Sequence, residues 1–230
     1  MTRKVLIVGA GKMGSALGHV LTHDSQNEVS YWDVDPEKCD DNLPLATKVT
    51  DAQVIFLCIT SWHIADAVQA IKDDVSSEAI LCALTKGIET TTKEWIPDYL
   101  EKHFASDKIL MLCGPMLSDE LNNDLPTKAV LAGDHKAYDT VSPLFEKTPL
   151  FVVHEKSARS VAMAGVLKNI YAMGLGIADA LALGADYKGL VVSSAIQEMY
   201  ALIEILGGDP HVARGFAVLG DLVATGHSPY

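Results

Sequence analysis

The stretch VLIVGAGKMGSALGHVL, residues 5–21, decides how this chain begins to fold. A short run of β-branched and apolar residues leads straight into glycines at positions 9, 11 and 14, and an amphipathic run follows. A strand that turns sharply at the first glycine and continues as a helix has this pattern, and the third glycine lets helix and strand approach closely. The sequence therefore predicts a strand, a glycine turn and a helix at the start of the chain.

This Gly-x-Gly-x-x-Gly spacing between a strand and a helix predicts a dinucleotide-binding turn. The second glycine lets the backbone approach a pyrophosphate, and the free amides at the helix N-terminus face its charge. By itself the spacing also occurs in glycine-rich turns that bind nothing. The expected cofactor contacts of the turn are Gly9, Ala10, Gly11, Lys12, Met13 and Gly14. In this set the Lys12 side chain either offsets pyrophosphate charge or projects into water.

An acidic residue in the next apolar run strengthens the dinucleotide hypothesis. Asp33, in VSYWDVD (29–35), follows Gly14 by 19 residues. A carboxylate at this place accepts hydrogen bonds from the adenosine ribose and repels a 2′-phosphate. We therefore expect NAD(H) rather than NADP(H). The alternative is that Asp33 or Asp35 only begins the turn that follows and caps it.

Short apolar runs alternate with amphipathic segments up to residue 154, the pattern of β-α-β units in a mainly parallel sheet. Expected strands span 4–10, 28–34, 54–60, 79–85, 109–115, 128–133 and 150–154. Expected helices span 12–23, 62–72, 91–104, 116–123 and 135–146, and then 156–183, 187–206 and 209–217. We predict a Rossmann-type doubly wound α/β domain over residues 1–154 and a partial all-helical substrate and dimerisation domain over 155–230.

The composition of the chain limits the kinds of partner that it can bind. The 230 residues carry a net charge of −12, which argues against nucleic acid or an anionic membrane surface as the main partner. The four cysteines form no CxxC pair and are expected to be reduced thiols of a cytoplasmic protein. The eight histidines include no pair that we interpret as having metal-ligand spacing, so no metal site is expected.

A lysine interrupts the most apolar stretch, AGVLKNIYAMGLGIADALALG (164–184). Lys168, Asn169 and Asp179 break this run, so we expect it to be buried in protein and not inserted in a membrane. Burying an unpaired ammonium is costly, so Lys168 needs a partner or a function. The alternative is a surface lysine whose stem lies along apolar surface.

Three further stretches, LTKGIE (84–89), CGPMLSDEL (113–121) and AVLGDLVAT (217–225), join the glycine turn and the lysine segment in one pattern. Together they resemble the NAD-dependent glycerol-3-phosphate dehydrogenases of the bacterial and eukaryotic type, within the 6-phosphogluconate dehydrogenase-like superfamily. The resemblance covers essentially the whole chain. It implies interconversion of dihydroxyacetone phosphate and sn-glycerol 3-phosphate by hydride transfer with NAD.

The resemblance also assigns roles to residues. It implies that Lys168 is the proton donor and acceptor and that Lys86 and Asp221 complete the catalytic cluster. The implied substrate-binding residues are Lys86, Gly114, Met116, Lys168, Asn169, Asp221 and Thr225. Lys86 and Ser118 are also implied on the cofactor side. Met116 stands where the family usually has a substrate-contacting serine, and Ser118 where it has an alanine.

These roles agree with the chemistry of ketone reduction. A buried ammonium beside the ketone oxygen supplies both positive charge and a proton to the developing alkoxide. Burial and a second cation, Lys86, should lower the pKa of Lys168, and Asp221 should oppose that shift.

The last residues, TGHSPY (225–230), precede the place where the family carries an Arg-Asn pair, whose arginine binds the substrate phosphate. We therefore expect a C-terminally truncated chain with weak or absent activity. Helix faces left without cover predict a homodimer or an exchange of domains between copies.

Two other functions stay open at this stage. One is an NAD-dependent reductase of another small carbonyl compound, because one fold serves many substrates. The other is a catalytically inactive dinucleotide-binding protein that acts as a sensor or assembly partner.

Overall fold

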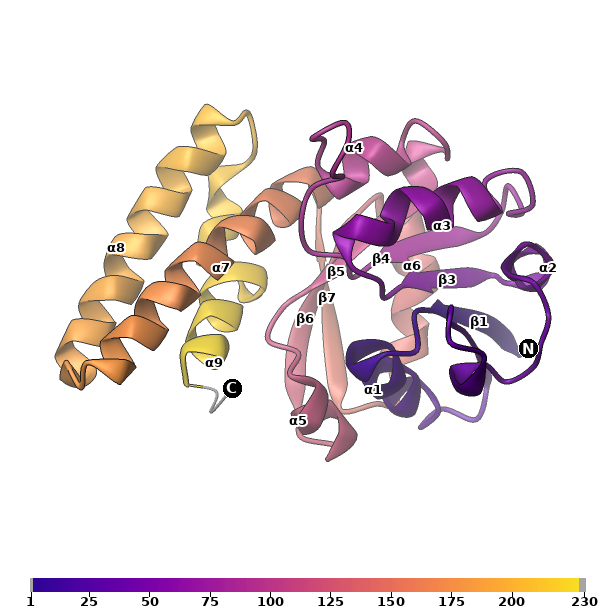
Figure 1. The fold of residues 1–230 in the computed structure, drawn as a ribbon, viewed down its shortest axis with the longest axis horizontal. Helices are drawn as coiled ribbons and strands as arrows, with labels where there is room; N and C mark the ends of the chain where they lie inside the picture. Colours follow the sequence, from indigo (N-terminus) through magenta and orange to yellow (C-terminus); the bar gives the residue numbers. More distant parts are fainter. Residues whose placement is uncertain (1, 228–230) are drawn as a thin grey trace.

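A seven-stranded sheet forms the centre of the larger part of the molecule, and a computed structural model describes residues 2–227 (Figure 1). The strands run in the order β2-β1-β3-β4-β5-β6-β7. They are β1 (Arg3–Val8), β2 (Asn27–Trp32), β3 (Val54–Leu57), β4 (Ile80–Ala83), β5 (Ile109–Cys113), β6 (Thr127–Gly133) and β7 (Leu150–Glu155). Every pair is parallel except β5 with β6, which is antiparallel. The predicted α/β, mainly parallel fold is confirmed.

The central strands are buried on both faces, which explains their continuous apolar sequence. Along β4, Leu81 and Ala83 point into one core, and Ile80 and Cys82 point into the other. Helices α1 (Lys12–Leu21), α5 (Ser118–Asn122) and α6 (His135–Val141) cover one face. Helices α2 (Leu45–Asp51), α3 (Ile64–Ile71) and α4 (Ile96–Leu100) cover the other.

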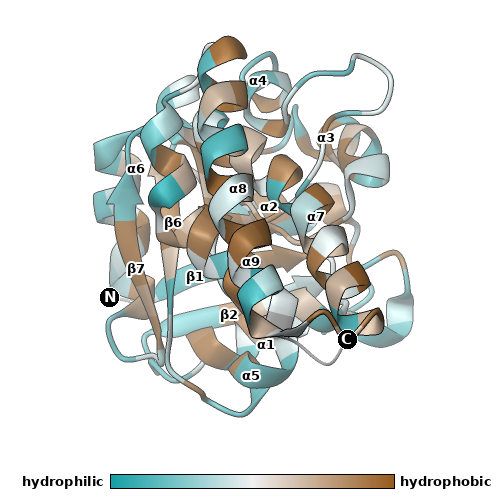
Figure 2. Cartoon of the chain, turned by 90° about the vertical axis from the view of Figure 1, so that its left-hand side faces the viewer, coloured by the Kyte–Doolittle hydropathy of each residue, from teal (hydrophilic) through white to brown (hydrophobic). Residues whose placement is uncertain are grey.

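The chain after β7 is helical. A long helix, α7 (Ala158–Ala180), contacts the sheet at β5 and pairs with α8 (Gly184–Ile205). A 3-10 turn (Pro210–Arg214), a π-helical turn (Phe216–Gly220) and α9 (Asp221–His227) follow, and α9 contacts α7. The helical region faces the viewer in Figure 2, where brown hydrophobic segments interrupt α7 and α8.

The expected helix over 209–217 is corrected. Asp209 caps the short turn by accepting a hydrogen bond from the His211 amide, and Pro210 begins it. Gly215 is then extended, with φ −87° and ψ −179°, so the helical path breaks there. Helical structure resumes at Phe216 and continues into α9. The sequence pattern did not predict this break, and it did not predict a second helix after residue 217.

Two other helices differ from expectation. The predicted helix over 91–104 is only α4, because the residues before it form a turn built around Glu89. In contrast, α2 lies where no helix was predicted. Its sequence is mostly polar, but Leu45 and Val49, one helical turn apart, are buried in the core. The remaining short 3-10 turns are Pro36–Lys38, Ser61–His63, Ser106–Lys108 and Ser142–Phe145.

Candidate active site

The fold requires glycine at two positions of the glycine turn, Gly9 and Gly14, but not at the third, Gly11. Gly9 has φ +97°, and a Cβ there would lie 2.7 Å from the Cys58 carbonyl oxygen. A Cβ at Gly14 would overlap the Gly9 carbonyl oxygen, so the helix can approach the strand only with glycine here. Gly11, the N-cap of α1, is exposed, and a Cβ there would meet no atom within 4 Å. This open position, at the positive end of a helix, suits the approach of a pyrophosphate.

Asp33 lies beside this turn. Its Oδ2 accepts a hydrogen bond from the Ala10 amide at 2.8 Å, and its Oδ1 accepts one from the Asp35 amide at 3.0 Å. The capping contact belongs to Asp35, whose carboxylate accepts a hydrogen bond from the Glu37 amide. Asp33 thus connects the end of β2 to the glycine turn, where a carboxylate can reach a ribose.

A pocket of about 490 Å³ opens next to the glycine turn, at the carboxyl ends of the parallel strands. Ligands of doubly wound sheets bind at this edge, near the point where the strand order reverses, here between β1 and β3. The pocket is lined by Met13, Cys58, Ile59, Thr60, Ser61, Trp62, Leu84, Lys86, Leu112 and Met116. Trp62 is 73% exposed, so it lies at the rim of the pocket and is not a core residue.

Four predicted site residues converge beside this pocket. Lys86 follows β4, Lys168 lies within α7, and Asp221 and Thr225 are on α9. Asp221 Oδ2 is 2.8 Å from Lys86 Nζ and 3.1 Å from Lys168 Nζ. Lys168 Nζ also donates a hydrogen bond to Thr225 Oγ1 at 2.8 Å, and this hydroxyl is 3.3 Å from Asp221 Oδ1.

The two lysines differ in burial and in pKa. Lys168 is 3% exposed, and burial followed by repulsion from Lys86 lowers its pKa, against the attraction of Asp221. The Lys86 side chain is 32% exposed. Burial lowers the pKa of Lys86, but attraction to Asp221 and Cys113 outweighs that effect, so its pKa is raised. Lys168 is therefore the group that releases a proton more readily.

The segment after β5 carries three more predicted residues. Gly114 packs against β6, where a Cβ would lie 2.9 Å from the Ala129 Cα. Met116 is buried and contributes an apolar wall to the pocket. Ser118 is half-buried at the start of α5 and is not among the residues that line the pocket.

Two predicted residues lie apart from the lysine cluster. Asn169 is exposed on α7, and no hydrogen bond joins it to the cluster among the described residues. Adjacent helical residues point about 100° apart, so Asn169 cannot follow Lys168 inward. Lys12 is exposed at the start of α1, where its ammonium faces solvent.

The arginines of the chain are all engaged away from this cluster. Arg3 pairs with Asp24, Arg159 pairs with Asp98, and Arg214 lies over the Tyr200 ring. The two positive charges that pair with Asp221 therefore belong to lysines, Lys86 and Lys168.

Two family models match most of the chain. The family models for the N-terminus and the C-terminus of NAD-dependent glycerol-3-phosphate dehydrogenase match residues 39–139 and 158–230. A glycerol-3-phosphate dehydrogenase [NAD(P)+] of Acaryochloris marina is 30% identical over 230 residues, covering 99% of this chain and 72% of that protein. Its counterpart from Thermoanaerobacter sp. is 28% identical, covering 96% and 73%. The crystal structure of glycerol-3-phosphate dehydrogenase from Coxiella burnetii has the same fold, with a TM-score of 0.87, 22% identity, and coverage of 99% and 77%.

Proposed function

Because the chain belongs to the NAD-dependent glycerol-3-phosphate dehydrogenase family, we propose that it interconverts dihydroxyacetone phosphate and sn-glycerol 3-phosphate with NAD(H). The observation that carries this proposal is the buried Lys168 ammonium, which shares Asp221 with Lys86 beside the dinucleotide cleft. A protein that only bound nucleotide would have no need for two lysines that share one buried carboxylate there.

Each residue of the cluster has a different role in ketone reduction. When bound, NADH supplies the hydride for the ketone carbon. Lys168 Nζ gives its proton to the ketone oxygen and takes a proton back from the alcohol in the oxidation direction. Thr225 and Asp221 hold the Lys168 ammonium in place by a hydrogen bond and an ion pair. Lys86 adds positive charge close to the developing alkoxide.

A single assay tests the activity and the role of Lys168. Lys168→Ala should lower NADH-dependent reduction of dihydroxyacetone phosphate by about 10²–10⁴-fold, the contribution of a general acid. NADH binding, followed by quenching of tryptophan fluorescence, should stay nearly unchanged. Lys188→Ala is the matched control, because Lys188 is also an ion-paired lysine of the helical region, 2.8 Å from Asp179. Turnover in Lys168→Ala close to that of the control would refute the role of Lys168.

A second substrate class has specific support in the pocket. Met116 presents a buried apolar side chain, and the arginines of the chain are engaged elsewhere. Both features suit a small carbonyl compound without a phosphate. Reduction of unphosphorylated dihydroxyacetone as fast as of its phosphate, in the same assay, would favour this class. The expected result is a preference for the phosphate, because Lys86 and Lys168 bring two positive charges to the site.

We also propose that the protein is a cytoplasmic homodimer. Three apolar residues of α7 and its C-cap residue lie at i, i+3, i+7 and i+11 and are 55–64% exposed, namely Ile170, Met173, Ile177 and Leu181. An apolar stripe of this kind favours association, and the same stripe of a second copy can cover it by two-fold symmetry.

By length and composition α7 could also span a membrane, although 44% of its most apolar segment is buried and it carries the ion-paired Lys168. The four free cysteines fit a reducing compartment.

A further inference from the structure

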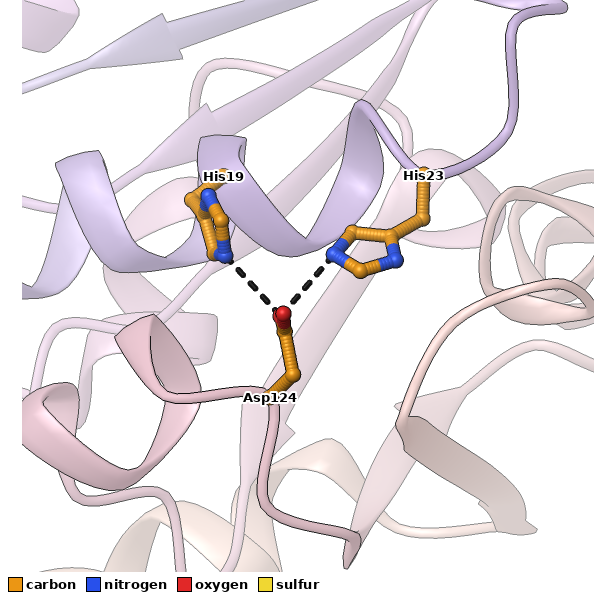
Figure 3. A group of neighbouring side chains, drawn as sticks. All are labelled: His19, His23 and Asp124. Carbon is orange, nitrogen blue, oxygen red and sulfur yellow. Dashed lines mark hydrogen bonds and ion pairs between the residues drawn. The ribbon is translucent and has the colours of Figure 1, made fainter.

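Two histidines and an aspartate converge on the surface away from the pocket (Figure 3). Asp124 Oδ1 is 2.9 Å from His19 Nε2 and 2.9 Å from His23 Nε2. The three side chains are 32–48% exposed, so an ion can reach them from solvent. The expectation that no histidine pair has metal-ligand spacing is therefore wrong for His19 and His23, which lie one helical turn apart.

The backbone brings these groups together from two elements. His19 is in the last turn of α1, and His23 follows the helix C-cap at Thr22 on the same side. Asp124 lies just after α5, with φ +56°, in the left-handed region that disfavours most side chains. Glycine would close this helix end at lower cost. The aspartate that stands there instead directs its carboxylate at both imidazoles.

The donor atoms suit a transition metal. The ligand atoms all lie within 4.8 Å of one another, and in a tetrahedral site they would be roughly 3.3–3.5 Å apart. A small rotation of the side chains would therefore admit an ion. Two imidazole nitrogens and one carboxylate oxygen favour Zn²⁺ and its neighbours over Mg²⁺ or Ca²⁺, which prefer oxygen.

We propose that His19, His23 and Asp124 form a binding site for a divalent transition-metal ion of the Zn²⁺ type, with water in the remaining coordination position. The ion would tie the end of α1 to the turn after α5. Because α1 has ten residues, this end lies about 15 Å from the glycine turn, so the ion would brace the cleft without touching the reacting atoms.

Metal titration of the full chain tests the proposal. After treatment with a chelator, the protein should bind one Zn²⁺ per chain by calorimetry. Co²⁺ should give the visible absorption of a tetrahedral site. At 100-fold excess over the dissociation constant, Zn²⁺ should raise the Tm by about 5–10 °C.

Variants locate the ion. His19→Gln, His23→Gln and Asp124→Asn should each weaken Zn²⁺ binding at least about tenfold, because each removes one ligand. These side chains are partly exposed, so the variants should fold, and circular dichroism checks this. His135→Gln is the matched control, because His135 pairs with Asp139 one turn away at 3.1 Å but has no second histidine on that carboxylate. Absence of Zn²⁺ binding, or equal loss in His135→Gln, would overturn the proposal.

Discussion

At Lys168 a buried ammonium is kept charged by a carboxylate that it shares with a second lysine. Lys86 and Lys168 bring two positive charges to Asp221, so the cluster has a net positive charge within a chain of net charge −12. A buried charge is tolerated only when it is paired. This local excess of positive charge is what an anionic substrate requires, and it also makes the Lys168 proton easier to release.

The first prediction concerns the pH dependence of reduction. The proposed role of Lys168 as proton donor needs its ammonium form, and its pKa lies below the ordinary 10.5, so kcat/KM should fall as pH rises through this lowered pKa. Asp221→Asn removes the attraction that supports the ammonium and should move this alkaline limb to lower pH. Lys86→Met removes the repulsion and should move it to higher pH. Steady-state kinetics from neutral to alkaline pH measure both shifts, and a shift of both variants in the same direction would contradict the assignment.

The second prediction concerns the choice between NADH and NADPH. Asp33→Ala should reduce the preference for NADH, as a ratio of kcat/KM values, by about tenfold or more, because the ribose loses its acceptor and a 2′-phosphate loses its repulsion. Asp35→Ala is the control, because that carboxylate caps the following turn and does not contact the glycine turn. An unchanged ratio in Asp33→Ala would show that this carboxylate only ties Ala10 to β2.

At the scale of elements, the segment after Lys86 shows how one side chain overrides a helical pattern. The Glu89 carboxylate accepts hydrogen bonds from the amides of Thr91 and Thr92, at 2.9 and 2.5 Å. These bonds lower the pKa of Glu89 to about 2. Lys93 then takes φ +62°, which ends the turn, and α4 begins only at Ile96. Local side-chain hydrogen bonds of this kind compete with helix formation.

The third prediction follows from this turn. A carboxylate with a lowered pKa stabilises the fold above its ordinary value of 4.5, and this stabilisation is lost as the pH falls toward 2. Glu89→Gln should therefore lower the urea midpoint at neutral pH by roughly 0.5–1 M, and the difference from wild type should vanish in acid. Glu78→Gln removes an equal charge from an exposed ion pair and should change the midpoint little. A Glu89→Gln deficit independent of pH would contradict this account.

At the scale of the whole molecule, the site exists only where the helical region meets the sheet. Lys86 comes from the end of β4, and Asp221 comes from α9, which is held against α7. The same α7 that presents Lys168 inward presents the stripe of Ile170, Met173, Ile177 and Leu181 outward. Packing on the outer face can therefore influence the helix that carries the proposed proton donor.

The fourth prediction concerns that outer face. Met173→Glu places a charge in the centre of the stripe and should raise the dissociation constant of the dimer at least about tenfold, because a charge there would have to be desolvated. Size-exclusion chromatography with light scattering measures the mass. Ile205→Glu is the control, because Ile205 is 79% exposed at the end of α8, away from the stripe. A wild-type chain that remains monomeric at high protein concentration would refute the proposed dimer.

The sequence alone determined the strands, the glycine turn and the family, because these depend on local periodicity and on motifs in fixed order. It also supplied Lys86, Lys168, Asp221 and Thr225 through the family resemblance. Two segments show the limit of prediction from sequence. Hydrogen bonds to the Glu89 carboxylate shortened the helix expected over 91–104. Burial of Leu45 and Val49 stabilised α2, which was not predicted.

Only the tertiary structure decided which distant side chains meet. Lys86 and Asp221 are 135 residues apart, and their ion pair at 2.8 Å depends on how α9 packs against α7, which in turn contacts the sheet at β5. His19 and Asp124 are 105 residues apart, so nothing in the sequence indicated that this carboxylate meets the two histidines at the end of α1. Periodicity reports which face of an element is apolar, but contacts between elements arise from packing of the whole chain, and that packing placed the charges of both sites.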